Sequence, residues 1–424
     1  MNLILKGNIC YSQTPTQLKT LANGYLVCED GVSRGVFSEI PAAFKAFPLA
    51  DYGSDLIIPG LTDLHLHAPQ YAFRGLGMDL ELLDWLNTHT FPEEGRYADL
   101  AYAEKAYDLF VDDLARGATT RAAVFATLHL PATLLLMEKL ERSGLVTLVG
   151  KVNMDRNAPD FLREESAQAA CETTRAWLDQ TLGRFKNTAP ILSPRFIPTC
   201  SDPLMDALGK LQREYGLPVQ SHLSENRGEI DWVRALCPEV DCYGGGYNRF
   251  GLFGGAGVPT IMAHCVWSAG IEEDLLFENG VYVAHCPQSN INLSSGIAPV
   301  RRFINRGIRV GLGTDVAGGC HPSILRAMSD AIQVSKLYWR LVDQDCPPLT
   351  VPEAFYLGTL GGGSFFGKVG SFEAGYELDA VLVDDSALRS PGQLSVEDRL
   401  ARIIYLSEGV SVRAKYVCGR QIQM

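Results

Sequence analysis

The sequence predicts an α/β fold, a (β/α)8 TIM-like barrel with a small β-sandwich domain formed by both chain ends. In the middle of the chain, eight short apolar runs alternate with amphipathic stretches, which is the pattern of βα units. Five of these runs end next to a histidine or an aspartate. Since catalytic residues of such barrels lie at the carboxyl ends of several strands, these side chains should meet at one face.

The elements follow one another in this order. Short β-like pieces occupy residues 3–7, 24–28 and 35–37 at the start of the chain, and residues 378–383 and 414–422 at its end. The barrel strands are expected at 61–66, 119–125, 145–151, 190–196, 218–223, 259–264, 281–285 and 309–314, with amphipathic helical stretches that include 98–116, 130–143, 160–182 and 202–215. We therefore expect a β domain from residues 1–58 and 372–424, and a catalytic barrel from residues 59–371.

The segment from Ala68 to Tyr97 is a long connection directly after the first histidine motif. It carries Leu80, Leu82, Trp85 and Phe91 among its apolar residues. We expect it to cover the site, and ordinary packing over the barrel mouth is compatible with the same role.

Composition excludes several classes of partner. The net charge of −12 argues against nucleic acid or an anionic membrane as the main partner. No apolar stretch is long enough to span a bilayer, and early charge interrupts any signal peptide. The eleven cysteines form no CxxC pair, which predicts reduced, mostly buried thiols in the cytoplasm rather than a disulfide framework.

The most informative motif is GLTDLHLH at residues 60–67. His65 and His67 stand two residues apart, so in a strand both imidazoles point to the same side. The other interpretation is a pair of polar residues at a strand end. With the later histidines and Asp315, the set suits zinc or another divalent transition metal, which would lower the pKa of a bound water.

Glu225 follows His222 by three residues. It need not bind metal and could move protons beside it, as a general acid/base must. The alternative is a solvated carboxylate at a helix start, beside Asn226 and Arg227.

Taken in order, these motifs resemble the amidohydrolase superfamily. HxH comes first, then His222 with Glu225, then His264, then HCPQSN at 285–290, then GLGTD at 311–315. The resemblance covers essentially the whole chain, including the split β domain. Two-metal members carry a carboxylated lysine at the end of the fourth strand. Residues 191–197 read ILSPRFI and have no lysine there, which implies the one-metal branch, rich in purine and pyrimidine deaminases.

Further segments are similar to superfamily members that deaminate guanine. They are residues 59–71, 83–86, 90–92, 194–196, 220–227 and 311–319. HxH and GTD are shared across the superfamily, whereas SHLSEN, PRF and the position of Gln70 are more selective. The resemblance implies hydrolytic deamination of guanine to xanthine and ammonia by a cytoplasmic enzyme, often a homodimer.

The resemblance also assigns roles to individual residues. The ligands of one divalent ion per chain, Zn²⁺ or alternatively Fe²⁺, would be His65, His67, His222 and Asp315. The catalytic residues would be Glu225 as proton shuttle, His264 as hydrogen-bond partner of the hydroxide, and Asp315, which helps remove its second proton. The purine edge would be held by Gln70, Arg195 and the backbone near Phe196.

Other interpretations of these residues stay open. Arg195 could form a salt bridge at the barrel rim, and Gln70 a loop hydrogen bond. His285 is expected to support the site rather than bind metal, and His89, His129 and His321 to be structural or surface residues. The alternative activities are an aminohydrolase or chlorohydrolase of another purine, pterin or triazine heterocycle, an amide-ring hydrolase, or a non-catalytic scaffold.

Overall fold

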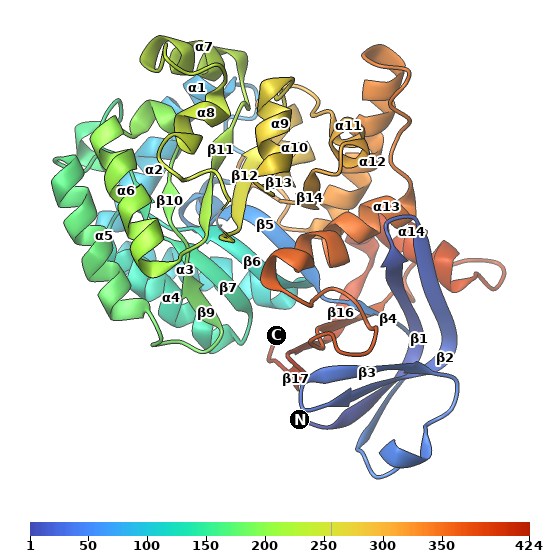
Figure 1. Cartoon of the computed structure of the whole chain (residues 1–424). Coiled ribbons are helices and arrows are strands. Elements are labelled where there is room, and N and C mark those ends of the chain that lie inside the picture. Colours follow the sequence, from blue (N-terminus) through green and yellow to red (C-terminus); the bar gives the residue numbers. More distant parts are fainter. Residues whose placement is uncertain (256) are drawn as a thin grey trace.

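The computed structural model describes residues 1–255 and 257–424, which form an α/β part and a β-rich part side by side (Figure 1). The α/β part contains two four-stranded parallel sheets, in the orders β5-β6-β7-β9 and β11-β12-β13-β14. Their strands are β5 (Leu61–His67), β6 (Thr119–Phe125), β7 (Val146–Gly150), β9 (Thr188–Pro190), β11 (Val219–Leu223), β12 (Thr260–His264), β13 (Tyr282–His285) and β14 (Arg309–Leu312).

Backbone contacts connect the two sheets at both edges. On one side, the N–H of Asp315, just past β14, donates to the carbonyl of His65 on β5 at 2.8 Å. On the other side, Leu192 bridges to Val219 of β11, and the short strands β8 (Val152–Asn153) and β10 (Ser193–Pro194) pair in parallel. The arrangement is of the TIM-barrel type.

A hydrophobic cluster joins the two sheets across their shared interior. It includes Leu64 of β5, Ala123 of β6, Ile261 of β12 and Ala284 of β13, all buried. Because strands from both sheets contribute, the sheets pack against a common core, and their carboxyl ends open on the same side.

Helices surround these strands or, in the case of α14, pack against α12 and the sheet formed by the chain ends (Figure 1). They are α1 (Leu82–Trp85), α2 (Phe91–Gly95), α3 (Leu100–Arg116), α4 (Leu130–Ser143), α5 (Ala167–Thr181), α6 (Asp202–Tyr215), α7 (Arg227–Leu236), α8 (Tyr243–Asn248), α9 (Ile271–Glu278), α10 (Pro287–Asn292), α11 (Val300–Asn305), α12 (Ile324–Leu341), α13 (Val351–Tyr356) and α14 (Val396–Tyr405). Local sequence explains their ends. For example, Ser201 caps the start of α6, and Gly216 ends it in the left-handed region at φ 64°.

Both chain ends join one seven-stranded sheet, in the order β17-β16-β15-β4-β1-β2-β3. Its strands are β1 (Leu3–Thr14), β2 (Gln17–Glu29), β3 (Val32–Phe37), β4 (Leu49–Pro59), β15 (Ala380–Asp384), β16 (Ser411–Val417) and β17 (Arg420–Gln421). A separate buried cluster with members such as Leu5, Leu26, Ile57, Phe372 and Leu382 lies against it. The sheet is attached to β6 by Arg121, whose Nε lies 2.7 Å from Asp379 Oδ2, with both side chains buried.

Two elements expected in the barrel are wrong in their bounds. The strand expected at 190–196 is broken into β9 and β10, since Pro190 and Pro194 have no N–H for a continuous ladder. The helix expected at 160–182 begins only after Ser166, which caps α5. Before it, Glu164 turns inward and its Oε1 accepts a hydrogen bond from buried Lys151 at 2.5 Å.

The segment between β5 and α3 is a chain of short turns. It contains α1, α2 and the turns η2 (Ala68–Phe73), η3 (Leu86–Thr90) and η4 (Arg96–Ala98). The remaining 3-10 or π turns are η1 (Ala42–Phe44), η5 (Asp160–Leu162), η6 (Ile197–Thr199), η7 (Leu357–Gly361), η8 (Ser364–Phe366) and η9 (Ser407–Gly409).

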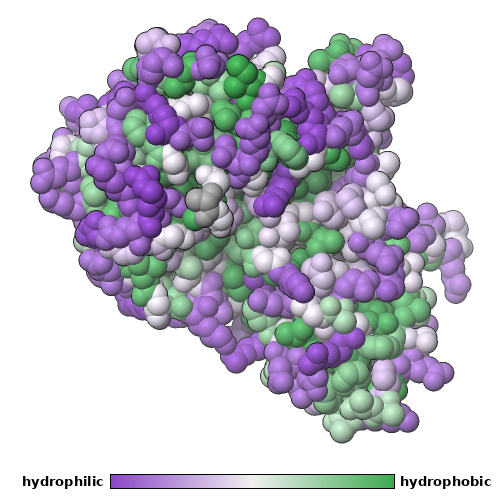
Figure 2. Space-filling view, viewed as in Figure 1, coloured by the Kyte–Doolittle hydropathy of each residue, from purple (hydrophilic) through white to green (hydrophobic). Residues whose placement is uncertain are grey.

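Hydrophilic side chains cover most of the outer helices on the face shown in Figure 2, and hydrophobic ones appear there in smaller patches. Within the described ranges, no helix combines the length and the apolar character needed to cross a lipid bilayer.

Candidate active site

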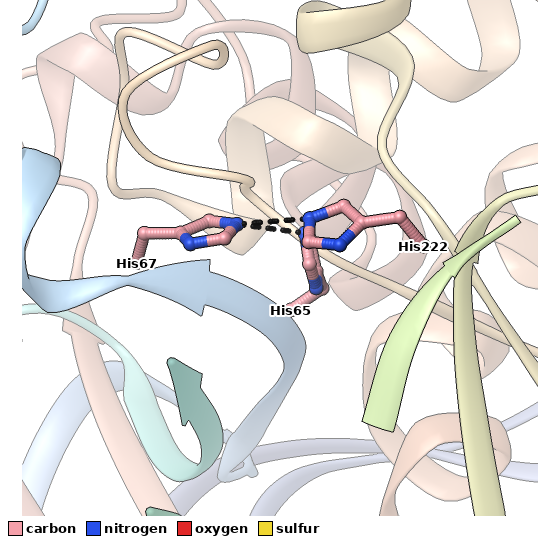
Figure 3. Close-up of side chains that lie close together, drawn as sticks. All are labelled: His65, His67 and His222. Atoms are coloured by element: carbon pink, nitrogen blue, oxygen red, sulfur yellow. Dashed lines mark hydrogen bonds between the residues drawn. The ribbon is translucent and has the colours of Figure 1, made fainter. Parts of the chain in front are cut away.

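His65 and His67 lie at the carboxyl end of β5 and point into the same space (Figure 3). Their Nε2 atoms are 3.3 Å apart, and both side chains are buried. The pairing of β5 with β6 shifts register between Asp63 and Leu66. Such irregularities re-aim side chains next to active sites, and this one lies directly at the histidine pair.

His222 adds a third imidazole from β11. Its Nε2 is 3.2 Å from His67 Nε2, and its Nδ1 lies 2.6 Å from the carbonyl oxygen of Arg195. Because a carbonyl can only accept, the proton of a neutral His222 is on Nδ1. The lone pair of Nε2 is then directed toward the other two rings.

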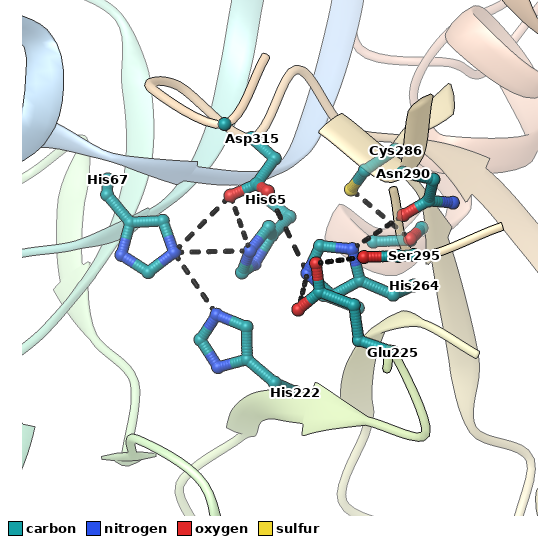
Figure 4. Close-up of polar contacts among 12 residues, drawn as sticks. His65, His67, His222, Glu225, His264, Cys286, Asn290, Ser295 and Asp315 are labelled. Carbon is teal, nitrogen blue, oxygen red and sulfur yellow. Dashed lines mark hydrogen bonds and ion pairs between the residues drawn. The ribbon is translucent and has the colours of Figure 1, made fainter. Parts of the chain in front are cut away.

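Asp315, just past β14, completes this group (Figure 4). Its Oδ1 lies 3.1 Å from His65 Nε2 and 3.5 Å from His67 Nε2. Burial lowers the pKa of all three imidazoles, which favours their neutral forms. Burial opposes the charged form of Asp315, but the histidines, His65 first, hold its pKa well below the usual range.

This donor set fits a metal ion. Two triads, His65–His67–His222 and His65–His264–Asp315, each hold ligand atoms within 4.8 Å of one another. Three neutral imidazoles cannot all satisfy one another at these Nε2 separations, since each nitrogen facing the centre needs a proton or a cation. A divalent ion bound by three nitrogens and one carboxylate satisfies all four groups.

Glu225 and His264 lie beside these four residues (Figure 4). Glu225 Oε2 is 3.4 Å from His264 Nε2, and its Oε1 accepts from Ser295 Oγ at 3.3 Å. His264 Nδ1 lies 2.9 Å from Asn290 Oδ1. Burial, followed by the charge of Asp315, raises the pKa of Glu225 well above its usual range. A solvated helix-start carboxylate, the alternative interpretation of Glu225, is therefore wrong.

The backbone is strained at the same positions. His264 has φ 72°, Asp315 φ 46° and Ser224 φ 45°, all in the left-handed region that non-glycine residues rarely adopt. Strain of this kind persists where surrounding contacts impose it, and it concentrates at functional sites.

Two supporting residues were missed by sequence reasoning. The buried Asp63 accepts from the N–H of Thr314 at 3.0 Å and from the N–H of His65 at 3.2 Å, which ties β5 to the loop after β14. Its spacing two residues before His65 was the available signal. Gly313 lets these segments approach, since a Cβ there would lie 2.9 Å from His65 Cβ.

The expected substrate residues line a pocket that opens onto this site. Glu225, His264 and Asp315 of this site form part of its wall. Gln70, Arg195 and Phe196 contribute to its wall, together with the apolar residues Leu82, Trp85 and Leu86 of the segment after β5. That segment therefore does cover the site, as expected.

Arg195 also forms the salt bridge that was its other interpretation, but it does so inside the protein rather than at the rim. Its partner is the buried Glu94, which also contacts Gln70. Sequence reasoning did not single out Glu94. Glu229 also reaches the pocket wall, and burial raises its pKa to about 7.

The remaining histidines belong to neither of the two triads. His285 is buried, burial lowers its pKa to about 3, and neither ring nitrogen has a hydrogen-bond partner within the described chain. His321 is exposed, while His89 and His129 are half-buried. Burial raises the pKa of Cys286 well above the usual range, so its thiol is not an activated nucleophile.

Comparison with known proteins shows to which family this chain belongs. Residues 56–422 match the amidohydrolase family. A guanine deaminase of Dictyostelium discoideum is 39% identical over 381 residues, which cover 88% of this chain and 84% of that protein. One of Escherichia coli is 36% identical over 385 residues, with coverage of 88% and 84%. A crystal structure of guanine deaminase from C. acetobutylicum with bound guanine in the active site has a TM-score of 0.96 and 44% identity, and covers 100% of both chains.

Proposed function

The chain belongs to the amidohydrolase family and, within it, to the guanine deaminases, and we propose that its pocket converts guanine and water to xanthine and ammonia. The observation that carries this assignment is the placement of the buried Glu225 and His264 between a metal-ligand set and a pocket wall with Gln70 and Arg195. Groups that can transfer protons and groups that can hydrogen-bond a flat heterocycle therefore face the same pocket.

We propose that His65, His67, His222 and Asp315 hold one divalent ion per chain, with zinc favoured and iron as the alternative. These ligand types suit either metal. When bound, such an ion supplies Lewis acidity that activates water near neutral pH. The hydrogen bond from His222 Nδ1 to the carbonyl of Arg195 fixes the ring orientation that such a ligand requires.

Glu225 is proposed to carry protons at its carboxylate oxygens. Glu225 would take the first proton of the attacking water and give it to the ring nitrogen beside C2, and the burial that raises its pKa favours the protonated form that donates. It would later deliver the second proton of that water to the leaving amine. His264, whose Nε2 faces both Glu225 and Asp315 at 3.4 and 3.8 Å, is placed to orient the attacking water. Asp315 would accept the second proton of that water before Glu225 delivers it to the leaving amine.

Gln70 and Arg195, with the backbone near Phe196, are proposed to hold the purine edge. Guanine offers the acceptors O6 and N7 along that edge, and a guanidinium offers a rigid fork of donors. The apolar side chains of Leu82, Trp85 and Leu86 would cover the ring faces and exclude water.

The decisive experiment is an assay with purified, metal-loaded enzyme that follows guanine loss, xanthine formation and ammonia release together. Parallel assays with adenine, cytosine, a pterin and a triazine test the alternative activities. Turnover of one of these, with none of guanine, would contradict the substrate assignment.

Assembly, location and domain bounds are further proposals. We propose a cytoplasmic homodimer, supported by the unpaired state of all eleven cysteines and by exposed Leu337, Leu341 and Val342 at the end of α12. Light scattering of the purified protein tests the dimer. We further propose that the eight parallel strands close into a (β/α)8 barrel over residues 59–371, and that residues 1–58 and 372–424 form a β-sandwich domain. Limited proteolysis tests these bounds.

A further inference from the structure

A buried carboxylate lies behind the two side chains proposed to hold the purine. Glu94, on α2, is 1% exposed. Its Oε1 accepts from Gln70 Nε2 at 2.8 Å, and its Oε2 accepts from Arg195 Nη1 at 2.5 Å. Gln70 follows β5 and Arg195 follows β10, so this one side chain ties α2 to two separate segments of the pocket wall.

These contacts determine which way the amide of Gln70 faces. Its Oε1 accepts from the backbone N–H of Ala317 at 3.1 Å, while its Nε2 donates to Glu94. A flipped amide would place its NH2 group against the Ala317 N–H and its oxygen against the carboxylate. Gln70 therefore has its second N–H left for a ligand, and it presents a donor.

Glu94 also fixes Arg195. The guanidinium is 3% exposed, and a buried cation requires a counter-charge. Glu94 supplies that charge and engages one amino group, while Phe91 lies 5.2 Å from the guanidinium carbon, measured to its ring centroid. Glu94 is the hydrogen-bond partner of this guanidinium in the described residues. Its other N–H groups are thus left as donors.

We propose that Glu94 is a positioning residue that sets the preference of the pocket for purines with a 6-oxo group, an inference that rests on the proposed function. With Glu94 in place, Gln70 and Arg195 both present donors. An oxygen at C6 accepts from donors, whereas an amine at C6 would face them with its own N–H groups, and a purine with hydrogen at C6 would leave them unpaired.

The test compares Glu94→Gln with Glu93→Gln, a control on the same helix. Glu93 is also buried, but its carboxylate pairs with Arg96 at 3.0 Å and contacts Tyr102 instead. For wild type and both variants we would measure kcat and KM for guanine, the metal content, and inhibition constants for hypoxanthine and for unsubstituted purine. Hypoxanthine carries the 6-oxo group, and purine does not.

In Glu94→Gln the new amide directs N–H groups at either Gln70 or Arg195. We expect the inhibition constant of hypoxanthine and the KM of guanine to rise about tenfold or more, the effect of a hydrogen bond to a charged group. The inhibition constant of purine, kcat and metal content should change less than about threefold. Glu93→Gln should leave all these values near wild type.

Equal increases for hypoxanthine and purine in an active, metal-loaded variant would overturn the proposal, because a general loss of structure affects both ligands alike. If Glu94→Gln does not fold, Glu94→Asp replaces it. Aspartate keeps the counter-charge but cannot reach both partners, so hypoxanthine should again lose more affinity than purine. Failure of the proposed function has a separate signature, which is a wild-type enzyme with metal and no guanine turnover.

Discussion

Replacement of Glu225 by glutamine removes a transferable proton while it preserves the shape of the side chain. The amide oxygen can still accept from Ser295 Oγ, which lies 3.3 Å from Glu225 Oε1 in the native protein. The amide nitrogen would lie where Oε2 now faces His264 Nε2 at 3.4 Å. Neither of these partners belongs to the proposed ligand set, so metal content should stay near that of the wild type.

The expected loss of turnover follows from the role. A positioned general acid/base contributes about 10²–10⁴-fold, which corresponds to about 2.7–5.4 kcal/mol in the activation barrier. Since Glu225 is proposed to act in more than one proton transfer, we expect kcat to fall by at least about 100-fold. Ultraviolet detection of xanthine gives kcat, and elemental analysis gives the metal content of the same sample.

Glu272→Gln is the matched control. Glu272 is a buried carboxylate near the same strand ends, but it accepts hydrogen bonds from Ser224, Ser268 and the N–H of Gly244 outside the pocket. Its replacement should lower stability by about 1–3 kcal/mol and leave kcat within about threefold. A Glu225→Gln enzyme that retains most of its turnover with normal metal content would refute the proton-shuttle assignment.

Four further predictions concern metal, substrate, domain contact and pH. Purified protein should hold about one divalent ion per chain, and alanine at His65 or Asp315 should lower metal content and activity together; elemental analysis that finds two ions per active chain would contradict the one-metal assignment. Arg195→Ala should raise the KM for guanine sharply with the metal retained, and the wild type should reject adenine; robust adenine turnover without guanine turnover would argue against this recognition. Asp379→Asn should lower the free energy of unfolding by about 1–3 kcal/mol, because the buried guanidinium of Arg121 loses one of its two carboxylate partners and keeps only Glu377. A change below about 0.5 kcal/mol in denaturant unfolding would count against the pair. Burial lowers the pKa of Lys415 from 10.5 to about 7. Between these two pH values the unfolded chain binds one more proton than the folded chain, so this residue makes the free energy of unfolding rise with pH by up to about 1.4 kcal/mol per pH unit. Lys415→Met should reduce that slope when unfolding is measured from pH 7 to 9, and equal slopes in the two proteins would show that Lys415 is charged in the folded protein.

Sequence patterning predicted regular, buried elements well. The strand at 119–125 has the bounds of β6. Its residues, TTRAAVF, include three β-branched side chains and a phenylalanine, which favour a strand. The site was predictable from the order of such segments. His222, His264 and Asp315 each follow a short strand-like run, and strand polarity alone brings their side chains to one end.

Elements that depend on polar tertiary contacts were harder to predict. The strands β1 and β2 form a long hairpin over residues 3–29, but their partly exposed positions interrupt the apolar pattern, so only fragments at 3–7 and 24–28 were expected. Glu164 falls within the helix expected at 160–182, because its buried pairing with Lys151 has no signature in the local sequence. The position of Glu94 likewise depends on how several short turns fold over the site.

Arg195 contacts both a proposed metal ligand and a residue behind the proposed substrate pocket, through different atoms. In two-metal relatives a lysine at this strand end supplies a ligand. Here the side chain of Arg195 is directed to Glu94 at the pocket wall, whereas its backbone carbonyl accepts from His222 Nδ1 at 2.6 Å. The two functions of this residue therefore lie on different atoms. Since Arg195→Ala removes only the guanidinium, the orientation of His222 should survive the substitution. A variant that lost metal as well as guanine affinity would show that the side chain, and not the carbonyl, holds the ligand set in place.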